Sequence, residues 1–327
     1  MTNSHVEKKQ QSIIRPRPAL FGALVAIALN FALLQPTAAS DGSAIKTTMP
    51  PAGAAETGEP EHTADSVSRE LANPNSSLST LKFQNQYRWY TGDLPGAKDQ
   101  DNYTMLFQPV FPLALPPDDS GNKSTIFFRP AFPLVFDQPV LRNNGLGFDK
   151  VSALGDIQFD LAYGVSRADG VLWAVGMVGT LPTATDQAVA GKQLRLGPEM
   201  LLAKFEKWGL YGIFPSHQWN VTGWSKESYN TTQFQPVLKF LLNDGWTAGT
   251  APIGFYNWGT SDWTVPLNLT ISKTAIFGKI PWKFDIEVNY YFDQPNAFGP
   301  EWMIGFNFAP VINNPFQKLF NRLIGVK

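Results

Sequence analysis

The sequence contains no cysteine, and this absence excludes several kinds of site at once. Disulfides, thiolate metal sites and the lipid-bearing cysteine of a lipoprotein are all ruled out. Charged residues are also scarce, at 16% of the chain, against about a quarter in ordinary soluble domains. Acidic and basic residues number 27 and 26. Without a basic surplus, the chain lacks the electrostatic footprint of a nucleic-acid-binding protein.

Apolar runs long enough for a membrane-spanning helix are lacking as well. Residues 19–34 form an apolar stretch, but it is shorter than the about 20 residues that a helical span requires. Basic residues precede this stretch, and small residues follow Pro36. Residues 1–39 are therefore predicted to be an export signal peptide. An uncleaved anchor helix is the alternative.

Sequence motifs of enzymes are absent. The chain has no nucleophile elbow, no phosphate-binding loop and no paired-histidine metal spacing. Of its three histidines, only His217 falls after residue 80. It is in phase with Tyr211, Ile213 and Trp219, which indicates a structural position on an aromatic outer face rather than a catalytic one. We therefore predict no enzyme activity, no catalytic residue, no metal site and no cofactor.

Alternation of apolar and polar residues is the strongest positive signal, and it is clearest at residues 280–292. Side chains point to opposite faces of a strand with period two. One face of this stretch is therefore apolar and aromatic, and the other is polar and charged. The apolar set is Trp282, Phe284, Ile286, Val288, Tyr290 and Phe292, and the polar set is Lys283, Asp285, Glu287, Asn289 and Tyr291.

Similar segments recur from residue 80 onward, at lengths that suit a tilted membrane-spanning strand of about 9–11 residues. Twelve can be counted, an even number. Connections after the fourth, sixth and eighth are short, whereas those after the third, fifth and seventh are long, including residues 137–155. The sequence thus predicts an all-β fold, a transmembrane antiparallel up-and-down β-barrel of about 12 strands over residues 80–312. Short turns and both barrel ends would face the periplasm.

The segments that flank the predicted barrel differ from it in composition. Residues 40–79 are acidic and poor in large apolar side chains, which predicts a disordered periplasmic linker with at most a helical turn at residues 66–71. Residues 313–327 form a short amphipathic C-terminal tail. Its apolar residues at helical spacing fit an interfacial helix, and a frayed tail is the alternative.

Polar residues opposite the apolar stripes are the candidates for lining the lumen and setting selectivity. They carry both signs of charge, so we predict no strong preference for anions or cations. A narrow lumen filled by paired side chains is as compatible with the pattern as an open pore. The principal candidates are Arg88, Gln108, Arg129, Gln158, Asp160, Arg195, Glu199, Lys239, Lys283, Asp285 and Glu287, with Lys82, Gln84, Gln233, Gln235, Asn268 and Asn307 as further members.

Prolines recur in two adjacent predicted strands, as Pro109 with Pro112 and Pro130 with Pro133. Proline lacks the N–H group that a sheet ladder needs. These four residues therefore mark a candidate lateral opening in the barrel wall. A pair of bulges that only bends the strands is the alternative.

The proline-bearing strands at residues 107–113 and 128–134, the stretch Gly155-Asp156-Ile157 and the stretch His217-Gln218-Trp219 carry a resemblance to a known family. Over residues 81–310 the chain resembles the outer-membrane family associated with the meta-pathway of phenol degradation. The resemblance implies a barrel that admits small molecules, aromatic ones included, and it supplies no catalytic residues. The acidic linker and the C-terminal tail depart from that pattern, which leaves the accessibility of the lumen open.

The leading prediction is a channel of the bacterial outer membrane that passes small solutes, including aromatic or hydrophobic ones, by passive diffusion. The alternative is a structural or adhesive barrel with a closed lumen, acting through its extracellular loops. A barrel enzyme and a soluble β-sandwich or lipid-binding barrel are less favoured. The expected partners are outer-membrane lipid, the small-molecule solute and the barrel-assembly machinery during biogenesis.

Overall fold

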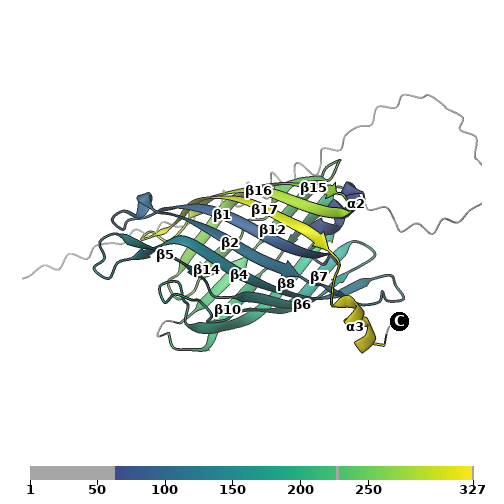
Figure 1. The fold of residues 1–327 in the computed structure, drawn as a ribbon, viewed down its shortest axis with the longest axis horizontal. Helices are drawn as coiled ribbons and strands as arrows, with labels where there is room; N and C mark the ends of the chain where they lie inside the picture. Colours follow the sequence, from purple (N-terminus) through teal and green to yellow (C-terminus); the bar gives the residue numbers. More distant parts are fainter. Residues whose placement is uncertain (1–62, 226–227, 326–327) are drawn as a thin grey trace, which may run out of the picture. The chain divides into compact units, whose positions relative to one another are not determined.

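The computed structural model of the protein describes residues 63–225 and 228–325. The predicted signal peptide and linker residues 40–62 lie outside the described residues. The described chain forms a closed barrel of twelve antiparallel spanning strands (Figure 1). None of the described helices is long and apolar enough to cross a membrane. The prediction of an antiparallel β-barrel of about 12 strands is confirmed.

Seven spanning strands are single segments, and five consist of two segments in line. The single segments are β1 (Ser79–Thr91), β4 (Lys123–Leu141), β7 (Val171–Thr180), β8 (Gln193–Phe205), β15 (Asp262–Phe277), β16 (Ile280–Asp293) and β17 (Gly299–Ile312). The divided strands are β2 (Asp101–Val110) with β3 (Leu113–Ala114), β5 (Phe148–Leu154) with β6 (Gln158–Ser166), β9 (Gly209–Ile213) with β10 (Ser216–Gly223), β11 (Asn230–Phe234) with β12 (Pro236–Leu241), and β13 (Trp246–Thr250) with β14 (Gly254–Asn257). A short 3₁₀ turn, η1 (Ala97–Asp99), separates β1 from β2.

The barrel is closed by pairing of its first and last strands. The β1–β17 ladder runs from Ser79 opposite Ile312 to Thr91 opposite Gly299. The alternating stretch at residues 280–292 forms most of β16, which pairs with both β15 and β17. Its polar face is therefore fixed against the polar faces of two neighbours, because directly opposed residues lie on the same face of a sheet.

Aromatic and aliphatic side chains cover the outer surface of the barrel. Trp89 and Tyr290 each lie opposite Trp302 on neighbouring strands, and the Tyr290 and Trp302 rings are 4.7 Å apart. All three are exposed. Such outward aromatic groups mark the membrane interface of outer-membrane barrels. Their exposure excludes the soluble β-sandwich, in which they would have to be buried.

The prediction of a long loop at residues 137–155 is wrong. β4 continues to Leu141, a short turn follows, and the chain returns as β5 in register with β4. Asp137 sits at a register shift with a φ of 53°. This bulge breaks the alternation that the sequence analysis relied on but leaves the pairing intact. The element is a projecting hairpin rather than an irregular loop.

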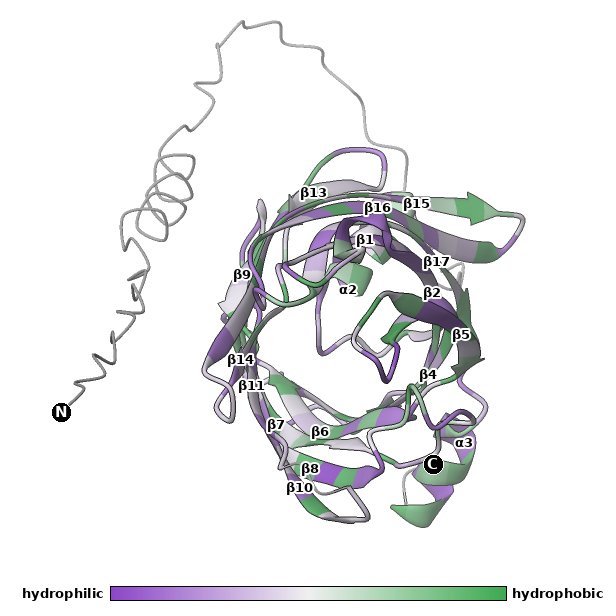
Figure 2. Cartoon of the chain, turned by 90° about the vertical axis from the view of Figure 1, so that its left-hand side faces the viewer, coloured by the Kyte–Doolittle hydropathy of each residue, from purple (hydrophilic) through white to green (hydrophobic). Residues whose placement is uncertain are grey.

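Both flanking segments contain helices. α2 (Ala64–Ala72) begins at Thr63, whose side chain accepts a hydrogen bond from the N–H of Ser66. The predicted disordered linker therefore does not extend to residue 79. α3 (Gln317–Leu323) shows that the C-terminal tail is helical rather than frayed. Figure 2 shows α2 inside the ring of strands and α3 outside it.

Candidate functional site

The segment before β1 enters the lumen and is held to the short turns at one end of the barrel. We call residues 63–78, comprising α2 and the connector after it, the plug. Arg69 donates to the carbonyl oxygens of Glu206 and Lys207, at 3.1 and 3.3 Å. The N–H of Gly245 donates to Asp65 Oδ1 at 2.5 Å. These partners lie in the β8–β9 and β12–β13 turns, so α2 bridges two separate parts of the rim.

Asn75 fixes the connector to a third part of the barrel. The residue is 6% exposed, and its Nδ2 donates to the carbonyl oxygens of Val165 and Trp173, at 3.0 and 3.1 Å. Gly164 makes this contact sterically feasible, because a Cβ atom there would lie 2.4 Å from Asn75 Oδ1. Residues of the plug were not among the predicted site residues.

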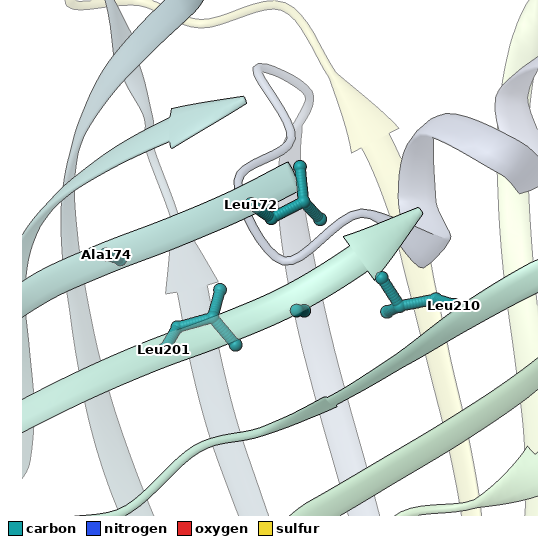
Figure 3. Packing of buried hydrophobic residues seen from close by; sticks show 5 residues of the cluster. Leu172, Ala174, Leu201 and Leu210 are labelled. Carbon is teal, nitrogen blue, oxygen red and sulfur yellow. The ribbon is translucent and has the colours of Figure 1, made fainter. Parts of the chain in front are cut away.

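Apolar side chains line the wall beside the plug. Figure 3 shows four of them on adjacent strands, and together with Ala203 they form one buried cluster: Leu172, Ala174, Leu201 and Leu210. Phe205 packs against the cluster, and the Arg69 guanidinium lies 4.4 Å from its ring centre. The remaining space among Pro74, Asn75, Phe127 and Leu201 is about 20 Å³, enough for roughly one water molecule. The plug therefore packs closely against this part of the wall.

Charged residues of both signs meet in the lumen and form what we call the charge cluster. Arg129 pairs with Asp160 at 2.7 Å, and Lys283 pairs with Asp285 at 2.9 Å. Glu199 lies within electrostatic range of Arg129 and Asp160. Lys82 and Lys239 interact with the Lys283–Asp285 pair, and Glu287 interacts with both of these lysines. The sequence placed all eight on the polar faces, and the structure brings them together.

The other principal candidates for the lumen are not members of the charge cluster. Arg88 bonds to Gln86 and, at 3.4 Å, to Thr104 on the neighbouring strand. Gln108 lies directly opposite Lys82. Gln158 and Arg195 line a different space, an outer cavity at the opposite end of the barrel from the plug. A role of these residues in selectivity stays a prediction.

The outer cavity measures about 600 Å³. Its wall combines inward-facing residues of β4, such as Pro133 and Val135, with the loop at residues 181–192. Asp156 holds that loop, since its carboxylate accepts hydrogen bonds from the N–H groups of Thr183, Ala184 and Gly191 at 2.7–3.0 Å. A volume of this size lies within the 300–1,000 Å³ range of small-molecule pockets.

The proline-bearing strands are interrupted where the sequence indicated. β2 pairs with β4 up to Phe107 opposite Phe132, and β3 resumes the same register at Leu113 opposite Ile126. Residues 108–112 and 127–131 between these points have no partners in that ladder. We call this gap the seam. It contains Pro109, Pro112 and Pro130, whereas Pro133 lies in a paired position opposite Leu106 and faces the outer cavity.

A second interruption, which the sequence analysis missed, separates residues 250–254 from residues 265–269 and contains Pro252 and Pro266. Here side-chain amides replace the ladder. Asn268 accepts from the N–H of Ala251 at 2.8 Å, and Gln235 donates to the Ala251 carbonyl oxygen at 3.3 Å. Two predicted lumen residues thus close a gap in the wall.

His217 lies on the aromatic outer face, as its phase predicted. Its Nδ1 is 2.7 Å from Thr232 Oγ1, and its ring packs against Trp219. Within the described residues its Nε2 has no hydrogen-bond partner. The described residues also contain no cluster of side chains suited to a metal ion.

Comparison with known proteins identifies the fold. No family model matches the sequence, and no curated protein matches it. An outer membrane channel from Pseudomonas putida F1 superposes with a TM-score of 0.52 at 11% identity, covering 72% of this chain and 94% of that one. The fold is that of a bacterial outer-membrane barrel. The specific resemblance to the phenol meta-pathway family stays a prediction.

Two further solved structures match more loosely. The β-domain of the Bordetella autotransporter BrkA has a TM-score of 0.43 at 8% identity, covering 72% of this chain and all of that one. Outer membrane phospholipase A from Escherichia coli has a TM-score of 0.40 at 12% identity, with 77% and 99% covered.

Proposed function

We propose that this outer-membrane barrel is a passive channel for small solutes that is gated at its periplasmic end. The observation that carries the proposal is the division of the lumen. An outer cavity of about 600 Å³ stands at one end. At the other end lies the plug, which is held by polar contacts and by the buried side chains of Val67 and Ala72. A purely structural barrel needs neither a cavity of ligand size nor a separately attached closing segment. The described match to an outer membrane channel agrees with this function.

The chemistry of the lumen suits small solutes that are neutral or weakly polar. Proline and valine side chains of β4 and the 181–192 loop supply apolar contact in the outer cavity, which would admit aromatic molecules. Below it, the charge cluster contains four basic and four acidic side chains, so the cluster has no surplus of one sign. No energy source is needed for diffusion through such a path.

Bilayer recording of the purified, folded protein tests the proposal. Reproducible single-channel events together with uptake of a small neutral solute are the expected result. Folded protein that gives neither ion current nor solute flux, even after removal of residues 63–78, would leave the closed, adhesive barrel as the function.

Replacing Lys283 by glutamate is expected to make the channel cation-selective. The substitution removes a positive charge that lies 2.9 Å from Asp285 and adds a negative one, which leaves two excess negative charges in the charge cluster. A reversal potential measured in a tenfold salt gradient should shift toward the cation value. Lys318→Glu on α3, outside the barrel, is the matched control and should leave the reversal potential unchanged.

We further propose that the barrel is not a hydrolase, although His217 approaches a hydroxyl group. Purified protein, His217→Ala and Thr232→Ala are expected to show the same background rate toward phospholipid and p-nitrophenyl esters. Trp258 Nε1 donates to Thr232 Oγ1 at 2.8 Å, which fits a hydrogen-bonded aromatic cluster. Ester cleavage that is lost on either substitution would contradict this assignment.

A further inference from the structure

We propose that the outer cavity is a binding site for small monocarboxylates with an apolar body, and that Arg195 binds the carboxylate group. The inference rests on the proposed function, because it takes the outer cavity as the entrance of the solute path. It adds one class of solute, anions with an apolar body, to the neutral solutes proposed above. It also differs from the sequence-based expectation that neither sign of charge is preferred.

Arg195 belongs to a row of polar residues along one wall of the outer cavity. Gln158 on β6 lies directly opposite Thr180 on β7, and Thr180 lies directly opposite Arg195 on β8 (Figure 2). Directly opposed residues lie on the same face of a sheet, and all three line the cavity. Among the described residues of the cavity wall, Arg195 is the only one with a positive charge.

The Arg195 guanidinium is not paired with a carboxylate. Within the described residues it forms no ion pair, and its buried Nε has no hydrogen-bond partner. Arg129 and Lys283 differ in this respect, because each pairs with an aspartate, at 2.7 and 2.9 Å. A guanidinium presents its N–H donors as a fork that matches the two oxygens of a carboxylate. Arg195 therefore retains the donors that a carboxylate solute needs.

Asp156 is the acidic residue of the cavity wall, and its carboxylate is occupied by the protein itself. Three backbone N–H groups of the 181–192 loop donate to it at 2.7–3.0 Å. Asp156 thus holds the loop in place and forms no ion pair with Arg195. A carboxylate that enters the cavity does not have to displace an existing partner of Arg195.

Two neighbours set the position of the guanidinium. Arg195 Cζ lies 4.1 Å from the centre of the Tyr229 ring, which is a cation–π contact. The backbone of Gly191 comes so close that a Cβ atom there would overlap Arg195 Nη2. The missing side chain at Gly191 therefore leaves the space that the guanidinium occupies, and both contacts hold this group in advance of binding.

Apolar side chains of the same cavity suit the body of such a solute. β4 contributes Val135, Pro139 and Val140, and the loop contributes Ala188 and Val189. Contact between apolar surfaces is favourable in proportion to the area removed from water. The cavity volume of about 600 Å³ is ample for a body of two aromatic rings. A neutral solute would use only the apolar wall, whereas a carboxylate would use both walls.

Equilibrium dialysis of the purified, folded protein in nonionic detergent tests the proposal. The probe is 2-naphthoate, and its uncharged counterpart 2-naphthamide has nearly the same shape. Micelles without protein correct for partition of each compound into detergent. We expect the natural protein to bind 2-naphthoate more tightly than 2-naphthamide by about tenfold or more, because hydrogen bonds to charged groups are the stronger ones.

Replacing Arg195 by glutamine is expected to weaken binding of 2-naphthoate by about tenfold or more and to leave binding of 2-naphthamide unchanged. Arg195→Lys keeps the charge without the fork and should give an intermediate affinity. Arg142→Gln, at an exposed arginine of the β4–β5 hairpin, is the matched control and should bind both compounds as the natural protein does. Unchanged binding of 2-naphthoate by Arg195→Gln would overturn the proposal. An equal loss for both compounds would also overturn it, because Arg195 would then only shape the cavity.

A second variant covers the case in which Arg195→Gln does not fold, as judged by heat-dependent gel mobility. Gly191→Ala keeps every charge but displaces the Arg195 guanidinium. Affinity for 2-naphthoate should fall by at least about threefold, with no change for 2-naphthamide. Equal affinities of Gly191→Ala and the natural protein for 2-naphthoate would count against the site.

Bilayer recording separates failure of the site from failure of the channel. When 2-naphthoate is added on the side of the outer cavity, it should reduce the ion current of the natural protein, and the current of Arg195→Gln should not respond. Binding of 2-naphthoate without any ion conductance would contradict the axial channel and leave the carboxylate site standing. Conductance together with equal, weak binding of both compounds would leave the channel standing and overturn the carboxylate site.

Discussion

Release of the plug is expected to raise the time-averaged ion conductance of the protein by more than tenfold. The variant combines Asn75→Ala with Asp65→Ala and Arg69→Ala. Asn75 is buried and makes two hydrogen bonds, each contributing about 1 kcal/mol. Asp65 and Arg69 are exposed, so their contacts add at most about 1 kcal/mol together. A total of about 2–3 kcal/mol changes the ratio of open to closed states by roughly 30- to 150-fold.

Single-channel recording at matched protein density measures this effect as open probability. Arg167→Ala with Asp169→Ala is the matched control, because this exposed pair lies in the β6–β7 turn on the same rim and, among the described residues, makes no hydrogen bond or ion pair with the plug. It should leave the open probability unchanged. If the triple variant conducts no more than the control, the plug is not the barrier, and the charge cluster itself must close the lumen.

Removal of Arg129 is expected to produce the largest loss of stability among single substitutions in the lumen. Arg129 pairs with Asp160 at 2.7 Å, with side chains only 20% and 15% exposed, and Glu199 is close by. In Arg129→Ala two carboxyl groups would share a partly buried site without a cation. Breaking a buried ion pair costs about 3–5 kcal/mol, and partial exposure lowers this to about 2–3 kcal/mol.

The unfolding temperature should fall by roughly 5–10 °C, read from the heat-dependent gel mobility of the barrel. Arg129→Leu with Asp160→Leu should recover most of the loss, because it removes both charges. Arg142→Ala, at an exposed pair with Asp149, is the control and should shift the temperature by no more than about 3 °C, since such pairs contribute under about 1 kcal/mol. An equal fall in unfolding temperature for Arg129→Ala and Arg142→Ala would show that the lumen screens charge as bulk water does.

The strands of the barrel were predictable because their two faces meet different solvents. Apolar and polar residues alternate without interruption along β16 from Trp282 to Phe292. The existence of this strand, its length and its inward-facing charges therefore followed from the period of two residues. The same reasoning failed at Asp137, where the alternation is interrupted by a bulge but the pairing of β4 with β5 continues on both sides of it. Bulges are set by backbone geometry, which a count of alternating residues does not detect.

The sequence did not predict the plug, and the reason is different. Its composition is that of a disordered segment, and it folds only because the barrel supplies most of its partners. Thr63 as cap, Asp65 in the first turn and Arg69 in the last turn are helix-terminus signals, and they could have located α2. They could not have placed it in the lumen. Its anchors, such as the Val165 and Trp173 carbonyl oxygens, are backbone groups 90 and 98 residues away from Asn75.

The pairing of the first strand with the last has a consequence for biogenesis. Residues 79–91 find their final partners at residues 299–312, so the cylinder cannot close until almost the whole chain is present. The plug directly precedes the first strand and is made long before the last one. Closure would therefore take place around it. Each new copy would be delivered to the membrane already sealed, and insertion would not breach the permeability barrier while assembly is under way.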